Sequence, residues 1–554
     1  MLPYGALPTP PLLLGALSTP LLQLGALPTP PLPGALTSPP LLLGALSGPL
    51  PKLGVVAVAL LAGVAILHRE VRFQALAMLG ALVLAPVLLL SDIWHSPQLS
   101  VVHRHPLVAV VGALLALGAV LVAALVLRKR PALLAGAVLV ALPFRIPIQA
   151  GGTTSNLLVP LYFVVAAGSL AFVLDGLRNP TAAVTPERGS RRWVDASPAR
   201  WLERLLAVYV VLYGIQATYS PDFEKALQQT VFFYVPFALA YCLLRRIDWT
   251  PRLARTCLVL LAGLAVLFAL VGFVEYATKT IFLNPKLIAA NAVHAYFTVN
   301  SVFFDPNIFG RFLALVMVLL GAVLLYARRE RTQLATLGVL AILWGALVLT
   351  LSRSSLGALL VGLAALAALR WRVGRAVLAA AVVVALAAAA IAVSPTTFGL
   401  NQGLNGASSG RPGLVSGGIN LFAARPLWGY GSGSFETEYA ARHHQPGQTL
   451  TASHTIPITI AAEQGLIGEL AYLALVAAAF VTLVQRARSD PPRVAVAAAF
   501  IALVFHTLLY ADFLEDPITW TLLAVGVALA RRSPAAPAPD PARGRDRPVE
   551  QQLA

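Results

Sequence analysis

Apolar runs separated by short polar connections repeat along the chain from residue 53 to residue 531. As helices, most of these runs are long enough to cross a hydrocarbon core roughly 30 Å thick. The predicted spans cover residues 53–67, 73–90, 107–127, 132–148, 156–174, 201–218, 227–244, 255–276, 306–326, 333–350, 354–369, 376–393, 456–484, 494–511 and 517–531. This pattern predicts an all-α, polytopic transmembrane helical bundle with about 12–15 spans.

The segments outside these runs divide the chain further. The first of them repeats Gly-Ala-Leu between proline-rich breaks, and so many prolines preclude a regular spanning helix. We therefore expect a low-complexity leader at 1–52, an N-terminal transmembrane bundle at 53–393, one large loop at 394–455, C-terminal transmembrane helices at 456–531 and a disordered basic tail at 532–554. The topology of the N-terminal part stays open.

Basic residues concentrate in alternate connections. The chain is 58% hydrophobic and 11% charged, with a net charge of +17. Its arginines form clusters, such as those at Arg128, Arg245 and Arg370, which the positive-inside rule assigns to the cytoplasm. We therefore expect a multi-pass cell-membrane protein with a cytoplasmic C-terminus. Nucleic acid is not an expected partner, because no docking feature accompanies these clusters.

The longest connection, residues 394–455, falls on the opposite, external face. It is rich in Gly, Ser and Asn, with several aromatic residues. Long ordered loops of this kind are often functional. We therefore expect the active site at the external face, under this loop.

The loop closes with the stretch TASHTIPITIAAEQGLIG at residues 451–468. Pro457 suits the first turn of a helix, and Thr455 is expected to cap that helix. His454 would then stand just before the helix N-terminus, at the external interface. Gly465 belongs to a stripe of small residues that lets another helix or a lipid tail approach closely.

Two arginines are expected near His454. Arg353 lies at an external helix junction in TLSRSSLG, and Arg411 begins the ordered part of the loop. Guanidinium groups bind phosphate oxygens bidentately, and a neutral imidazole, with an unperturbed pKa near 6.5, accepts a hydroxyl proton. Together they suit transfer of a glycosyl group from a phosphorylated leaving group. The simpler alternative is that His454 only caps or hydrogen-bonds the loop.

Three further charged residues are candidates for supporting roles. Glu463 lies inside an apolar helix, where ionisable groups are costly and often functional, but it is equally suited to a structural pairing with an arginine. Asp305 and Arg311 flank a helix entry. They either serve a donor pocket or, as we favour, form a capping ion pair.

Other strings are better explained without special chemistry. GYGSGSF at Gly429 lacks the strand and helix of a nucleotide loop, so a turn is expected. His443 and His444 with His454 lack a supporting carboxylate or cysteine pattern, so we expect neither zinc nor any other cofactor. The cysteines have no spacing that indicates a disulfide or a thiolate metal site.

Several strings together resemble one protein family. SRSSLGALLVGL at Ser352, GRPGLVSGGINLFAARPLWGYGSGSFETEY at Gly410 and HTIPITIAAEQGLIGELAYLALV at His454 are similar to the O-antigen ligase and O-antigen polymerase family of bacterial envelopes. FFDPNIFGRFLAL at Phe303 fits as well. The resemblance covers about residues 303–484, and AEQGLIG is its most specific string.

The resemblance implies a fold similar to the multi-spanning C-type glycosyltransferases. It also implies a metal-independent, inverting transfer of glycan from a polyprenyl diphosphate carrier such as undecaprenyl diphosphate to a glycan, lipid or protein acceptor. His454 would activate the acceptor hydroxyl, and Arg353 and Arg411 would hold the diphosphate. The family often has Asn where this chain has Thr455, which leaves a side-chain amide contact at that position in doubt.

Two alternatives stay open. The motifs do not separate a ligase, which moves a finished glycan, from a polymerase, which extends a carrier-linked repeat. A transporter or flippase of lipid-linked oligosaccharide is the alternative from another class, and it would place paired charges or broken helices near the membrane middle. The candidate charges gather instead at one face, which favours one-sided chemistry.

Overall fold

The structure is a computed structural model of the whole chain. It describes residues 48–93, 104–150, 153–178, 197–282, 287–288, 291, 296–371, 374, 411–443, 453 and 455–531. The leader up to residue 47, the predicted span 376–393, the first part of the large loop and the C-terminal tail lie outside these ranges.

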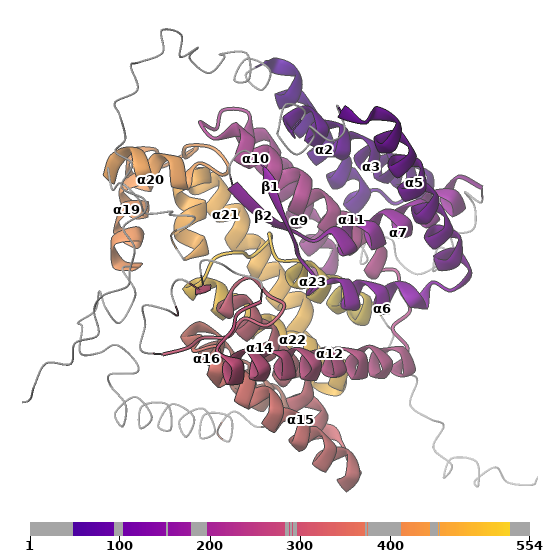
Figure 1. Ribbon diagram of the computed structural model, residues 1–554, viewed down its shortest axis with the longest axis vertical. Coiled ribbons are helices and arrows are strands. Elements are labelled where there is room, and N and C mark those ends of the chain that lie inside the picture. The colour runs from indigo at the N-terminus through magenta and orange to yellow at the C-terminus, as the bar shows by residue number, and fades with distance from the viewer. Residues whose placement is uncertain are drawn as a thin grey trace, which may run out of the picture. The chain divides into compact units, whose positions relative to one another are not determined.

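The described chain is built mainly from helices (Figure 1). Proline at the first or second position begins many of them, where its missing N–H costs little. The helices are α2 (Pro49–Leu67), α3 (Val71–Ile93), α5 (Pro106–Lys129), α6 (Ala132–Ala141), α7 (Val159–Arg178), α9 (Pro198–Ala217), α10 (Phe223–Gln229), η2 (Thr230–Tyr234), α11 (Val235–Leu244), α12 (Pro251–Thr278), α14 (Pro306–Tyr326), α15 (Glu330–Leu349), α16 (Arg353–Arg370), α19 (Arg411–Ala424), α20 (Phe435–His443), α21 (Ile456–Val484), η4 (Ala487–Ser489), α22 (Pro491–Leu509) and α23 (Pro517–Ala530).

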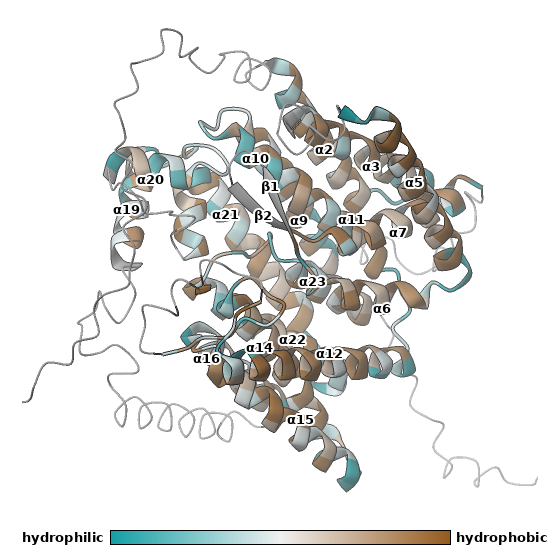
Figure 2. Ribbon diagram, viewed as in Figure 1, coloured by the Kyte–Doolittle hydropathy of each residue, from teal (hydrophilic) through white to brown (hydrophobic). Residues whose placement is uncertain are grey.

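Within the described residues, 11 segments are long and apolar enough to cross a membrane. The segment Phe223–Leu244 is one of them, and it is continuous through α10, the π-helical turn η2 and α11. Apolar residues cover most of the helices, and hydrophilic residues gather near many of their ends (Figure 2). The all-α, polytopic transmembrane fold predicted from the sequence is confirmed.

One predicted span is shorter than expected. The run 132–148 forms α6 only as far as Ala141, and the chain then enters a two-stranded antiparallel hairpin, β1 (Ile146–Ala150) and β2 (Thr153–Leu157). Its register pairs Ile146 with Leu157. Pro143 and Pro147 explain the early end of the helix, because proline disfavours the helical conformation of the residue before it.

Successive helices run in alternate directions, so the bundle has two chemically different ends. We call the basic end the one where Arg128 contacts Asp175, Arg245 contacts Ile66, and Arg488 contacts Ala368. The opposite end carries the connections 218–222, 300–305, 350–352, 426–434 and 511–516. We call it the site end, because the candidate residues lie there.

A buried carboxylate joins distant segments at the basic end. The carboxylate oxygens of Glu203 on α9 lie 3.1 Å from the guanidinium of Arg200, 2.5 Å from that of Arg245 and 2.5 Å from that of Arg531. Arg245 also donates to the carbonyl oxygen of Ile66 at 2.8 Å. Because a buried charge is costly unless it is paired, this cluster holds α2, α9, α11 and the end of α23 in one arrangement.

Candidate functional site

At the site end, α19 of the large loop runs parallel to the first part of α21, the helix that follows the loop. A Cβ atom added at Gly418 of α19 would lie 2.4 Å from the side chain of Ile458 on α21, so the two backbones are close at this level. Farther along α21 and just after the end of α19, Leu466 N donates to Pro426 O at 2.7 Å. Figure 1 shows α19 and α20 beside the first half of α21. The N-terminal ends of α19 and α21 therefore point the same way.

This parallel pairing concerns two of the predicted site residues. Arg411 is the first residue of α19, and α21 begins at Ile456, directly after the stretch that contains His454. The side chain of Arg411 and the whole of His454 lie outside the described residues. Their positions in the chain nevertheless adjoin helix N-termini at the same end of the pair.

The residues on either side of His454 are held by hydrogen bonds. The Ser453 hydroxyl accepts from Thr455 N at 3.1 Å and lies 2.8 Å from the Thr459 hydroxyl. Thr455 occupies the N-cap position of α21 as predicted, but its side chain makes no capping hydrogen bond. The side chain of Ser453 thus holds the N-cap residue of α21, whereas the capping hydrogen bond expected from Thr455 is not formed.

Helix α21 is broken at Gly465. This residue has φ 65° and ψ −165°, a conformation essentially restricted to glycine. An added Cβ would lie 2.4 Å from the carbonyl oxygen of Leu427. The predicted single helix is therefore two helical pieces, and the backbone of the turn after α19 approaches Gly465 closely.

The break exposes backbone groups that the turn at 426–435 and a side chain of α9 satisfy. Gly431 N donates to Glu463 O at 2.7 Å, and Gln216 Nε2 donates to Gln464 O at 3.1 Å. Gly429, Gly431 and Gly433 all have positive φ, which lets the turn follow the broken helix closely. The GYGSGSF string is a turn, as predicted, and it packs on α21.

Glu463 binds this turn through its side chain. Its carboxylate oxygens accept hydrogen bonds from Gly433 N at 2.9 Å and from Phe435 N at 3.1 Å, and the residue is buried. Successive backbone N–H groups in a glycine-rich turn form a concave site for an anion. Here the carboxylate of Glu463 occupies this site. Glu463 therefore has a structural role, and its partners are backbone N–H groups and not the expected arginine.

Arg353 begins α16 at the same end of the bundle, and it is exposed. Beneath it lies a buried polar cluster. Ser352 Oγ lies 2.8 Å from Asn307 Oδ1, and the hydroxyls of Ser354 and Ser355 each lie 3.2 Å from His506 Nε2. These contacts join the start of α16 to α14 and α22. They therefore hold the backbone of Arg353 in place.

His506 was not found by sequence reasoning. It lies inside an apolar run with no motif around it, and its contact with α16 spans 151 residues. A single polar residue in such a run is a weak signal, although ionisable residues within membrane spans are rare enough to merit attention.

Asp305 and Arg311 have different partners. Asp305 caps α14 by accepting from Asn307 N at 2.6 Å, whereas the fully buried Arg311 pairs with Asp516 at 2.9 Å and donates to Asp512 O at 3.1 Å. The expected helix cap is therefore present at Asp305. The ion pair of Arg311 fastens α14 to the connection before α23.

Glu515 is a further ionisable group of this end that the sequence analysis did not select. Tyr234 donates its hydroxyl to Glu515 Oε1 at 3.0 Å. Burial, and secondly the nearby carboxylate of Asp512, raise the pKa of Glu515 to about 7. The connection 511–516 therefore carries a carboxyl group that titrates near neutral pH.

This raised pKa predicts a pH dependence of stability. A carboxyl whose pKa is higher in the folded state stabilises the fold below its unfolded pKa, and that contribution is lost as pH rises to about 7. We expect the melting temperature of the purified protein to fall between pH 5 and pH 8, and Glu515→Gln to flatten this fall. Thermal unfolding in detergent at several pH values measures it. Identical slopes for the two proteins would contradict the assignment.

No group of three His, Cys, Asp or Glu side chains in the described part of the chain is arranged to hold a metal ion. His444 and His454 lie outside that part. Cys242 and Cys257 are both buried and free.

Comparison with known proteins identifies part of the chain. Residues 337–473 match the family model described as O-Antigen ligase. A search of curated proteins finds no match. The matched range extends from α15 into α21, and it contains Arg353, Arg411, His454, Glu463 and Gly465.

This range also includes the turn that Glu463 holds and the broken helix that receives it. The break in α21, the turn that packs on it and the family match therefore concern the same part of the molecule. The chain is a multi-pass membrane protein whose residues 337–473 match the O-Antigen ligase family model, and this match points to glycosyl transfer in polysaccharide biosynthesis.

Proposed function

We propose that the protein transfers an oligosaccharide from a polyprenyl diphosphate carrier to an acceptor hydroxyl at the external face of the cytoplasmic membrane. The main support is the arrangement at the site end, where the N-termini of α16, α19 and α21 bring three segments of the matched domain to one end of the bundle. These segments begin at Arg353, at Arg411 and just after His454.

In this proposal His454 removes the proton from the acceptor hydroxyl. The acceptor oxygen attacks the anomeric carbon, the bond from that carbon to the diphosphate oxygen breaks, and the configuration inverts. The guanidinium groups of Arg353 and Arg411 bind the leaving diphosphate and stabilise the charge that develops on it. The reaction needs no metal ion or nucleotide sugar, so a chelator should leave the rate unchanged.

Membrane geometry supports an active site at this end. The opposite end carries the arginine clusters, which the positive-inside rule assigns to the cytoplasm. The proposed donor would enter from the bilayer with its diphosphate at headgroup level, where Arg353 is exposed. Helix N-termini carry partial positive charge, which adds to the attraction for an anionic leaving group.

The test is a reconstituted transfer reaction. Purified protein in liposomes is given a synthetic polyprenyl-diphosphate oligosaccharide and candidate acceptors, and the products are separated by mass. A covalent product with an inverted anomeric centre is expected. Movement of the donor across the bilayer without any covalent product would instead identify a transporter and overturn the proposal.

The arginines give a separate prediction. We expect Arg353→Ala and Arg411→Ala each to raise the KM for the donor by about ten- to a hundredfold, because a hydrogen bond to a charged group contributes about 1.5–3 kcal/mol. The corresponding lysine variants should keep part of the binding, since the charge remains without the planar fork. Initial rates over a range of donor concentrations measure both.

Arg331→Ala is the matched control. Arg331 is an exposed arginine in the first turn of α15, at the basic end, so its loss should leave the donor KM unchanged. Unchanged donor KM in both Arg353→Ala and Arg411→Ala would refute the diphosphate role.

A further inference from the structure

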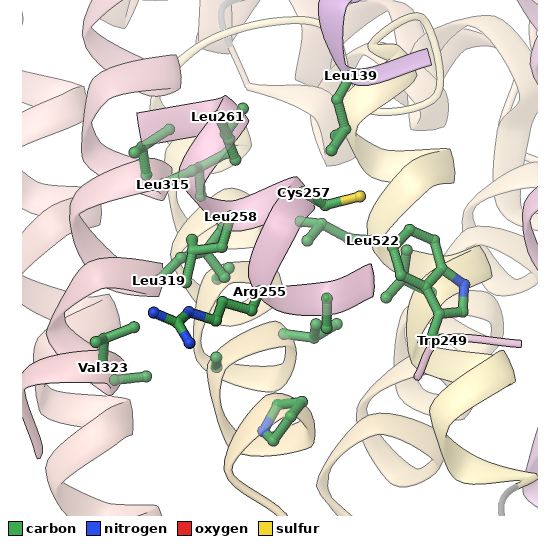
Figure 3. Close-up of a pocket in the computed structure, with 18 of the residues that line it drawn as sticks. Leu139, Trp249, Arg255, Cys257, Leu258, Leu261, Leu315, Leu319, Val323 and Leu522 are labelled. Carbon is green, nitrogen blue, oxygen red and sulfur yellow. The ribbon is translucent and has the colours of Figure 1, made fainter. Parts of the chain in front are cut away.

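An apolar cavity opens between membrane-spanning helices of the bundle. Its volume is about 420 Å³, and its walls come from α6, α12, α14, α22 and α23. Figure 3 shows Leu258 and Leu261 of α12 with Leu315 and Leu319 of α14 on one side, and Trp249 and Leu522 on the other. The lining is almost wholly apolar, so the cavity suits a hydrocarbon chain.

The cavity is deeper than one leaflet. On α12 its lining runs from Pro251 to Leu261, on α14 from Phe312 to Tyr326, and on α23 from Ile518 to Leu529. At 1.5 Å per residue these stretches span about 15 Å, about 21 Å and about 17 Å. Half of a hydrocarbon core of roughly 30 Å is about 15 Å. The cavity therefore has room for an acyl chain that enters at the basic end.

The polar groups at the cavity lie toward the basic end. Arg255 lines it one turn into α12, and it is exposed. In Figure 3 its side chain extends toward Leu319 and Val323 of α14. Trp249 and Tyr326 also line the cavity near the basic ends of their elements, and aromatic residues of these types are enriched at the level of the headgroups. A guanidinium at this height complements the phosphate of a lipid whose acyl chain enters the cavity.

We propose that this cavity is a binding site for an anionic phospholipid of the leaflet at the basic end, with one acyl chain between α12, α14, α22 and α23 and the phosphate at Arg255. The site does not depend on the proposed transfer reaction. The phosphate at Arg255 would lie at the end of the bundle opposite the candidate active site, which separates it from the diphosphate of the glycan donor. The bound acyl chain would fill the space between α12, α14, α22 and α23 and stabilise the packing of these helices.

The test compares the lipid bound to purified variants. The full-length protein is extracted in mild detergent from membranes that contain phosphatidylglycerol, and the bound lipids are identified and counted by mass spectrometry. We expect Leu258→Trp to lose the bound phospholipid, because the indole fills the cavity. Arg255→Ala should weaken the preference for phosphatidylglycerol over phosphatidylcholine about fivefold, since one arginine near a membrane surface contributes about 1 kcal/mol.

Arg252→Ala is the matched control. Arg252 is also exposed in the first turn of α12, but it does not line the cavity, so its loss should leave the preference unchanged. Should Leu258→Trp fail to fold, Val496→Phe fills the cavity from the opposite wall on α22 and gives the same readout. The proposal is overturned if a folded variant with a filled cavity retains the phospholipid. It is also overturned if the wild-type protein yields no phospholipid but only a polyprenyl lipid or detergent.

Discussion

Replacing His454 with alanine is expected to lower kcat/KM for glycan transfer by about a hundred- to ten-thousandfold, the usual contribution of a general base. The acceptor hydroxyl then loses the group that removes its proton, while donor binding by the arginines stays intact. The donor KM should therefore change little and kcat should carry the loss. Initial rates with the synthetic polyprenyl-diphosphate donor separate the two.

The pH profile adds a second readout. A neutral imidazole acts as base only above its own pKa, ordinarily near 6.5, so the rate of the wild-type protein should rise with pH through that region and the residual rate of the variant should not. His105→Ala is the matched control, because His105 is an exposed histidine at the N-cap of α5. Equal kcat in wild type and His454→Ala would exclude this histidine as the base.

Replacing Gly465 with alanine is expected to destabilise the fold by about 3 kcal/mol or more, since its backbone conformation alone costs other residues about 1–3 kcal/mol. The added Cβ would also lie 2.4 Å from the carbonyl oxygen of Leu427 and 2.7 Å from Gly429 N. Leu427 O accepts a hydrogen bond from Ile467 N of α21 at 3.4 Å, and Gly429 N donates to Arg425 O at 3.1 Å, so moving either atom disturbs a backbone hydrogen bond. A large loss of melting temperature, or of monodisperse protein in detergent, is the expected result.

The control is another glycine of a membrane helix. Gly263 lies in α12, and a Cβ added there meets no atom within 4 Å. Gly263→Ala should leave stability unchanged or raise it slightly, because alanine is the better helix former. A Gly465→Ala protein as stable as Gly263→Ala would show that the break in α21 is not required.

The transmembrane fold could be predicted because it follows from a single physical requirement. Within a bilayer, backbone groups must bond to one another, so apolar runs of sufficient length become helices. Runs such as 306–326 coincide with the observed α14. The predicted span 132–148 was wrong in its second half. There Pro143 and Pro147 end the helix although the residues are apolar.

Residues of the candidate site could be predicted only where a short sequence motif marks them. The strings around Arg353 and Gly465 mark the start of a helix and a position of close approach, and the structure has both. The partners of these positions are set by packing between distant segments. His506 contacts α16 and Asp516 contacts Arg311 across more than 150 and 200 residues, and the single chain carries no signal of either pairing.

The Glu463 contacts illustrate the same limit. A glutamate within an apolar helix indicates that some partner exists, and an arginine was a natural choice. The partner is the backbone of a glycine-rich turn about 30 residues earlier, and no side-chain pattern announces it. Sequence reasoning identified the unusual residue but not the group that satisfies it.

The charge cluster around Glu203 bears on how the chain matures during translation. Its carboxylate meets Arg200 and Arg245 early in synthesis, but Arg531 follows 328 residues later. Chains fold from the N-terminus as they emerge, so Glu203 can pair with these two arginines before the segment that carries Arg531 has left the ribosome. Arg531 then adds a third guanidinium to the same carboxylate, which fastens the end of α23 to the already assembled α9 and α11.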